Sequence, residues 1–246
     1  MTKKLNNILC SLALLASVLL LPFGATAEDD LSACIKPAEH DAVTFLLIDR
    51  SDKLEQVKNL EDSLKAVHQM MKPSERLIVA VSTDKGSDTR ILIDSVKPKK
   101  SLWVSKLKIR AAEKKFDECF EKMKSKVMVQ DESYNSSAIL ETLSFVSKAL
   151  KADKSANKRL IIFSDMIQNS SAVSFYKIKN FDADAQLKKV EKEYLVFDLP
   201  NTSVQVAGVG TGITDKRARA IEHFWKKYFE KTGASLDYFG PILLVG

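Results

Sequence analysis

Short apolar runs alternate with longer segments of helical pattern along most of this chain, and this alternation constrains the fold more than any other feature. Four of the runs are rich in strand-forming residues: Ala42–Ile48, Arg76–Val81, Arg159–Phe163 and Val204–Val209. A continuous apolar run of this length predicts a strand that is buried on both faces, as in a parallel sheet. Strands that alternate with helices form a mostly parallel sheet with helices on both faces. We therefore expect a doubly wound α/β fold.

Two weaker strands and five helices complete the expected order. The strands are the alternating segment Thr89–Val96, which suits a sheet edge, and the short segment Leu236–Phe239. The helices are expected over residues 53–71, 103–126, 137–150, 182–193 and 215–232. Pro73 marks the end of the first helix, and Thr214 and Gly233 suit the two caps of the last one.

The helix expected over residues 103–126 is rich in lysine. Its apolar face would contain Leu107, Ala111, Phe116, Cys119, Phe120 and Met123. The lysines are most simply the solvated face of this helix, and the alternative is a basic surface that binds a partner.

The first 27 residues have the three parts of a secretory signal peptide. Lys3 and Lys4 form a short positive region, Ile8–Phe23 is almost wholly apolar, and Ala25–Ala27 has the small residues of a cleavage site. The apolar run of about 15 residues is short for a membrane span, which needs about 20. We therefore expect cleavage and a periplasmic or secreted protein, with an uncleaved membrane anchor as the alternative.

Removal of the signal defines the remaining organisation. Residues 28–41 would form an N-terminal arm, and residues 42–246 a single α/β domain. The remaining chain has 36 basic and 32 acidic residues, a net charge of +4. This small excess, together with export, argues against a nucleic-acid partner. No second stretch is apolar and long enough to cross a membrane, so we expect no stable span after cleavage.

Two cysteines, Cys34 and Cys119, remain after the signal is removed. An even number of cysteines in an oxidising compartment favours a disulfide, which would tie the arm to the lysine-rich helix. The alternative is two separate buried thiols, because no local feature brings the two residues together.

Candidate ligands follow the buried strands. Asp49, Ser51 and Asp52 come after the first strand, Ser164 and Asp165 come after the third, and the segment 135–139 opens a helix between them. Ligands of doubly wound sheets bind at the carboxyl ends of the strands. Hard oxygen ligands suit Mg²⁺ or Mn²⁺. The pattern therefore indicates a candidate metal site at this edge.

The order of these parts resembles the von Willebrand factor A (vWA) domain, whose metal-ion-dependent adhesion site begins with Asp-x-Ser-x-Ser after a strand. Asp49 and Ser51 match the first two positions, Ser137 matches the family's threonine, and Asp165 matches its last aspartate. The resemblance extends over most of residues 42–239. It implies a vWA-like fold in which Asp49, Ser51, Ser137 and Asp165 hold a divalent metal and a protein partner's carboxylate completes the coordination.

The sequence departs from the family pattern at Lys53, which stands at the position of the second serine. The ammonium group of Lys53 would repel a cation or replace it by pairing with Asp49 or Asp165. Asp52, Ser136 and Ser164 are further candidates for the surroundings of the site. Two interpretations without metal remain open: a metal-free binding site, and aspartates that only cap helices and turns. The segment 169–171 would then cap a short helix.

We expect an exported, non-enzymatic module that binds a protein in the bacterial envelope or in a secretion or conjugation assembly. One alternative is a structural subunit of such an assembly whose metal site has decayed. The other is a metal-dependent phosphoester hydrolase, which the lack of a paired histidine or clear general base disfavours. The three histidines, His40, His68 and His223, match no zinc-binding spacing.

Overall fold

The computed structural model describes residues 31–50, 57–129, 136–176, 178, 180–209 and 215–243. Its centre is a six-stranded sheet in the order β3-β2-β1-β4-β5-β6. The strands are β1 (Ala42–Ile48), β2 (Glu75–Val81), β3 (Arg90–Val96), β4 (Asn157–Phe163), β5 (Thr202–Ala207) and β6 (Ser235–Phe239). All neighbouring strands pair in parallel except β2 and β3, so β3 is an antiparallel edge strand.

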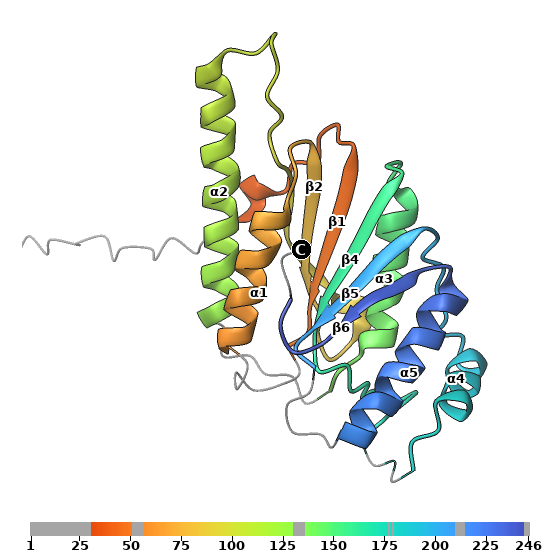
Figure 1. Cartoon of the computed structure of the whole chain (residues 1–246). Coiled ribbons are helices and arrows are strands. Elements are labelled where there is room, and N and C mark those ends of the chain that lie inside the picture. Colours follow the sequence, from red (N-terminus) through yellow and green to blue (C-terminus); the bar gives the residue numbers. More distant parts are fainter. Residues whose placement is uncertain are drawn as a thin grey trace, which may run out of the picture. The chain divides into compact units, whose positions relative to one another are not determined.

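Helices cover both faces of the sheet (Figure 1). They are α1 (Val57–Met70), α2 (Lys106–Val129), α3 (Ile139–Ala152), α4 (Ala183–Lys192) and α5 (Asp215–Thr232), with short 3-10 helices η1 (Leu31–Cys34) and η2 (Gly86–Asp88). Phe45 and Leu47 of β1 belong to the core formed with α3, α4 and α5, whereas Leu46 and Ile48 belong to the core formed with α1 and α2. Because successive strand residues point to opposite faces, one apolar run serves both cores. The expected doubly wound α/β fold is confirmed.

Several bounds of helices and strands differ from the sequence-based expectation. Helix α2 begins at Lys106 and α3 at Ile139, so Ser137 precedes α3 rather than opening it. In the interpretation where residues 169–171 only cap a short helix, that helix would follow them, but the described residues up to Tyr176 form none, and Asn169 forms isolated bridges with Ser137 and Ser174. In contrast, β1 and α5 have the expected bounds, and Gly233 follows α5 with the positive φ of 83° that a C-terminal cap requires.

The predicted apolar face of α2 is only partly correct. Phe116, Cys119, Phe120 and Met123 are buried as expected, but Leu107 is 77% exposed. A helix of 24 residues is about 36 Å long, whereas a strand of seven residues spans about 23 Å. The first part of α2 therefore extends past the sheet, where no core exists for Leu107 to enter.

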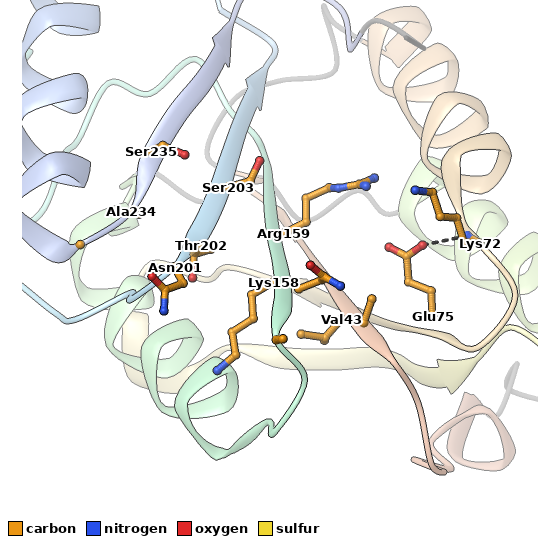
Figure 2. A pocket seen from close by; sticks show the side chains of 14 residues that line it. Val43, Lys72, Glu75, Lys158, Arg159, Asn201, Thr202, Ser203, Ala234 and Ser235 are labelled. Atoms are coloured by element: carbon orange, nitrogen blue, oxygen red, sulfur yellow. Dashed lines mark hydrogen bonds between the residues drawn. The ribbon is translucent and has the colours of Figure 1, made fainter.

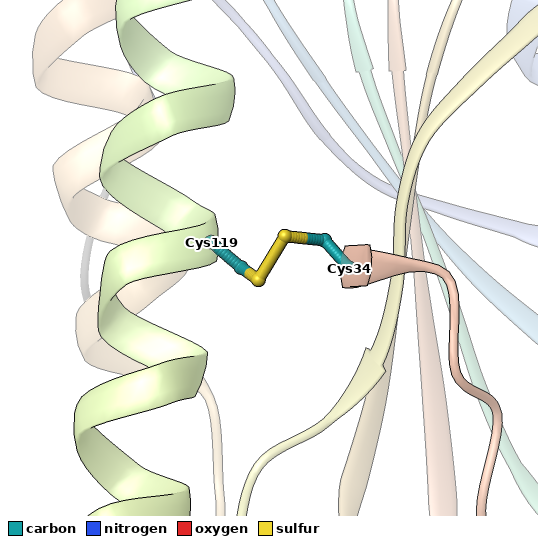
Figure 3. The surroundings of a disulfide bond; sticks show 2 residues. All are labelled: Cys34 and Cys119. Carbon is teal, nitrogen blue, oxygen red and sulfur yellow. A yellow bond between two sulfur atoms is a disulfide. The ribbon is translucent and has the colours of Figure 1, made fainter. Parts of the chain in front are cut away.

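The predicted disulfide between Cys34 and Cys119 is confirmed, and it joins η1 to α2 across 85 positions of sequence (Figure 3). The Cα atoms are 5.7 Å apart, and both residues are buried. The described part of the arm, from Leu31 onward, belongs to the same compact unit as the sheet. None of the helices in the described part of the chain is long and apolar enough to span a membrane.

Candidate functional site

The loops after β1, β2 and β4 meet at the carboxyl end of the sheet because backbone pairing continues one residue beyond these strands. The amide of Asp49 donates to the carbonyl of Phe163 at 2.9 Å, and the amide of Ser82 donates to the carbonyl of Ile48 at 2.9 Å. The residues that follow three neighbouring strands therefore lie side by side. The first residues of the site are therefore held by the backbone hydrogen bonds of the sheet.

The carboxylate of Asp49 is the centre of this site, since three serine hydroxyls donate to it. Ser137 Oγ lies 2.5 Å and Ser164 Oγ 2.8 Å from Asp49 Oδ2, and Ser82 Oγ lies 3.1 Å from Asp49 Oδ1. All three serines are at most 5% exposed. Hydrogen bonds to an ionised carboxylate are stronger than those between neutral groups, so this cluster holds Asp49 in one orientation.

Ser137 is held at the site by backbone pairing with the segment that follows β4. Its amide and carbonyl both bond to Asn169, at 2.9 and 2.8 Å. The fully buried Gln168 accepts from the amide of Leu140 at 2.9 Å and donates to Glu141 at 3.0 Å. Gln168 thus satisfies the amino end of α3, whose N-cap residue makes no side-chain cap. This arrangement fixes Ser137 without placing it inside the helix.

Asp165 lies in the turn directly after Ser164, and its carboxylate forms a hydrogen bond within that turn. Asp165 Oδ1 accepts from the amide of Ile167 at 2.8 Å, and Ser164 Oγ accepts from the amide of Met166 at 2.9 Å. Met166 has a φ of 63°, which is unusual for a residue other than glycine. The indole of Trp225 donates to the carbonyl of Met166 at 3.0 Å and stabilises this strained turn.

The structure brings together some of the predicted site residues and separates others. Asp49, Ser137 and Ser164 are in direct contact. Ser136 instead donates to the carbonyl of Asp84 at 3.2 Å, in the loop after β2. Ser51, Asp52 and Lys53 lie outside the described residues, so the expectation that Lys53 alters the site stays a prediction.

Ser82 is a site residue that the sequence interpretation missed. It follows β2 as Ser164 follows β4, since RLIVAV is followed by Ser82 and RLIIF by Ser164. The sequence therefore contained a signal that predicts Ser82 as a site residue, namely a hydroxyl directly after a buried strand that lies next to β1. The omission arose because Ser82 has no counterpart in the family motif on which the other residues were matched.

The donor atoms around Asp49 are all oxygen atoms: one carboxylate and three hydroxyls. In the described part of the chain, no three His, Cys, Asp or Glu residues are grouped as metal ligands. An oxygen-only set with one carboxylate fits a hard cation such as Mg²⁺, which keeps several of its waters, and does not fit zinc. The described groups that could hold such an ion are the carboxylate of Asp49, the hydroxyl oxygens of Ser82, Ser137 and Ser164, and Asp165 in the turn after Ser164.

The opposite end of the sheet carries a recess of about 740 Å³ lined by residues at the amino ends of the strands (Figure 2). Two of its charged side chains, those of Glu75 and Lys158, are engaged within the protein. Glu75 accepts from Thr44 Oγ1 at 2.5 Å and from the amide of Lys72 at 2.8 Å, and Lys158 Nζ donates to the carbonyl of Leu150 at 2.6 Å. These contacts have a structural role within the protein, and they identify no specific ligand for the recess.

A buried charge cluster beside this recess joins the N-terminal arm to the sheet. Arg76 binds Asp94 through two nitrogens, at 2.6 and 2.7 Å, and binds Asp153 at 2.9 Å. His40 Nε2 lies 2.7 Å from Asp153 Oδ2. Burial acts to raise the pKa of Asp153, but hydrogen bonds from Ser155, His40 and Arg76 outweigh it and lower the pKa to about 2. The sequence shows of His40 only that it matches no zinc-binding spacing, so its place in this cluster was not predicted.

No protein family model and no curated protein matches the sequence. Among solved structures, the chain is similar to a mutant of the minor pilin PilB from Streptococcus sanguinis, with a TM-score of 0.50 and 7% identity. The match covers 84% of this chain and 58% of the pilin chain. This likeness shows the fold alone, because the sequence identity is so low.

Two further similar structures have lower scores. A von Willebrand factor type A protein from Catenulispora acidiphila has a TM-score of 0.45 and 11% identity over 83% of this chain and 39% of its own. BatB from Bacteroides thetaiotaomicron has a TM-score of 0.42 and 10% identity over 82% of this chain and 91% of its own. The chain therefore spans less than two thirds of the pilin and of the Catenulispora protein. The strand order and the likeness to the minor pilin confirm the expected doubly wound α/β fold, at the level of fold alone.

Proposed function

We propose that this chain is an exported protein-binding module of the cell envelope, and that its partner binds at the carboxyl end of β1. The observation that carries the proposal is the convergence of three buried hydroxyls from separate elements on Asp49. Such a cluster lies where doubly wound sheets bind their ligands. The fold likeness to a minor pilin is compatible with a role in the envelope.

In the metal-dependent version of this proposal, Asp49 and the hydroxyls of Ser137 and Ser51 hold Mg²⁺ or Mn²⁺, with Asp165 acting directly or through water. The bound ion would supply an open position for a carboxylate of the partner. The oxygen-only surroundings of Asp49 support this version. The role of the protein residues is to orient Asp49 before the partner arrives, which reduces the entropy lost on binding.

The alternative version is a structural assembly subunit whose metal site has decayed. It is favoured by the three serine hydroxyls that donate to Asp49, because they already satisfy much of the hydrogen-bonding capacity of its carboxylate. Lys53, which stands where the family has a serine, is consistent with it. In both versions the module binds without catalysing a reaction.

Thermal unfolding of the chain from Glu28 onward, with Mg²⁺, Mn²⁺ or EDTA, distinguishes the two versions. A bound ion at a hundredfold excess over its Kd is expected to raise the Tm by roughly 5 °C or more. The double substitution Asp49→Ala and Asp165→Ala should abolish this shift, whereas Asp88→Ala, which changes an aspartate of η2, should keep it. A wild-type Tm that no divalent cation changes would exclude the metal-dependent version and leave the structural one.

A further inference from the structure

An exposed apolar cluster lies at the junction between β3 and α2. It consists of Leu102, Trp103, Val104 and Leu107, which are 101%, 96%, 43% and 77% exposed, and we call it the apolar tip. Single exposed apolar residues are common, but neighbouring Leu and Trp side chains in nearly full contact with water are not. A cluster of this kind marks a surface that becomes covered by something else.

The apolar tip projects away from the rest of the domain. No residue from Ser101 to Lys115 is buried, and the buried face of α2 begins only at Phe116. Figure 1 shows the loop after β3 and the first turns of α2 reaching beyond the amino ends of the neighbouring strands. A ligand with a broad, flat surface could therefore meet the apolar tip without touching the sheet.

Basic residues flank the apolar tip in the sequence, and the segment that contains them has no acidic residue. Between Asp94 and Glu113 the sequence contains six basic residues and no aspartate or glutamate: Lys97, Lys99, Lys100, Lys106, Lys108 and Arg110. Lys97 bonds to the carbonyl of Met71, and Lys99 pairs with Asp41. Within the described residues, the side chains of the other four form no ion pair. Further along α2, by contrast, Lys114 and Lys124 pair with neighbouring glutamates.

We propose that the apolar tip docks on the surface of an anionic phospholipid membrane. The charge pattern identifies the ligand, because a continuous positive field around apolar side chains complements a surface of negative headgroups. Tryptophan suits the boundary between headgroups and acyl chains, since its ring is apolar and its N–H is polar. A surface of this chain that binds a protein would be expected to contain acidic as well as basic residues, as the rest of α2 does.

Docking of this kind would be peripheral and would set the orientation of the domain. The apolar tip lies at the amino end of the parallel strands, because antiparallel β3 ends opposite Arg76 at the start of β2. The Asp49 cluster lies at the opposite end of the sheet. Membrane attachment through the apolar tip would therefore direct the Asp49 cluster away from the lipid. This inference does not depend on the proposed function of Asp49.

The two tryptophans allow a direct test by intrinsic fluorescence. Trp225 is fully buried and its Nε1 donates to Met166, so its emission should not respond to lipid. Trp103 is 96% exposed and should respond. The chain from Glu28 onward, which lacks the apolar segment 8–23, is mixed with phosphatidylcholine vesicles that contain either no phosphatidylglycerol or about one third of it. We expect a blue shift and weaker acrylamide quenching with the anionic vesicles only.

Vesicle co-sedimentation then tests the apolar part of the inference. The double variant Leu102→Ser and Trp103→Ser should lose roughly tenfold or more in partitioning, because two apolar side chains no longer enter the interface. The matched control is Val129→Ser, since Val129 is 77% exposed at the other end of the same helix. This control should bind as the wild type does.

A pair of triple variants tests the charged part. Each lysine near an anionic surface contributes about a fivefold increase in partitioning, so substitution of Lys100, Lys106 and Lys108 by Gln should reduce binding about a hundredfold. Substitution of Lys188, Lys189 and Lys192 of α4 by Gln changes the net charge equally and should have little effect.

Several results would overturn the inference. They are an unchanged Trp103 emission with anionic vesicles, equal binding by the Leu102→Ser and Trp103→Ser variant, or equal losses from the two lysine sets. A blue shift that grows with protein concentration in the absence of lipid would also overturn it, because the occupant of the apolar tip would then be a second copy of the chain.

Discussion

Ser137 Oγ lies 2.5 Å from Asp49 Oδ2, although the two residues are 88 positions apart in the sequence. This contact joins the end of the central strand β1 to the segment that precedes α3. It depends on the bridge between Ser137 and Asn169, which depends in turn on the end of β4. Three parts of the chain must therefore be folded together before the hydroxyl can reach the carboxylate.

Substitution of Ser137 by Ala should lower the free energy of unfolding by about 1–3 kcal/mol, because a buried, charge-assisted hydrogen bond to Asp49 is lost. Urea unfolding followed by circular dichroism measures the change. Ser136→Ala is the matched control, since Ser136 bonds only to a backbone carbonyl at the surface, and its effect should stay within about 0.5 kcal/mol. Equal effects of the two substitutions would contradict the assigned geometry.

The buried cluster of Arg76, Asp94, Asp153 and His40 should make stability depend on pH at the acid end. The pKa of Asp153 is lowered from 3.8 to about 2 in the folded protein, so its ionised form is stabilised by folding. The resulting stabilisation of about 2 kcal/mol is fully present above pH 4 and is lost as the pH falls through about 2. The difference in unfolding free energy between wild type and Asp153→Asn should therefore shrink over this range, and a constant difference would exclude the predicted linkage.

The Cys34–Cys119 disulfide should contribute about 2–5 kcal/mol to stability, because it closes a long loop in the unfolded chain. Reduction with dithiothreitol should lower the Tm of the wild type, and the double variant Cys34→Ser and Cys119→Ser should have the lower Tm without the reductant. The double variant should then show no further response to dithiothreitol. A wild-type Tm that reduction leaves unchanged would mean that the disulfide adds nothing to stability.

The sequence predicted the fold well where hydrophobic burial alone decides the structure. The run Ala42–Ile48 is apolar at nearly every position, so it could only be a central strand, and its observed bounds match the prediction. The exposure of Leu107 could not be predicted in this way. Helical periodicity shows which residues share a face, but it does not show how far a helix extends beyond the sheet on which it packs.

The candidate site was partly predictable for a different reason. Asp49 and Ser164 directly follow strands, and the parallel topology brings such residues to one edge. The cluster around Asp153 was not predictable, because His40, Arg76 and Asp153 are far apart in the sequence and show no common spacing. Polar contacts of this kind follow from the packing of the arm and the loop before β4, which no local pattern encodes.

Site-specific photo-cross-linking in cells that make the protein tests the central claim most directly. A photoreactive residue in place of Asp84, which is exposed beside the Asp49 cluster, should produce a discrete cross-link to an envelope protein, and Asp49→Asn should abolish it. The same residue in place of Lys154, at the opposite end of the sheet, should not form this cross-link. The absence of a cross-link from position 84, or its persistence with Asp49→Asn, would contradict a partner-binding role for the Asp49 cluster.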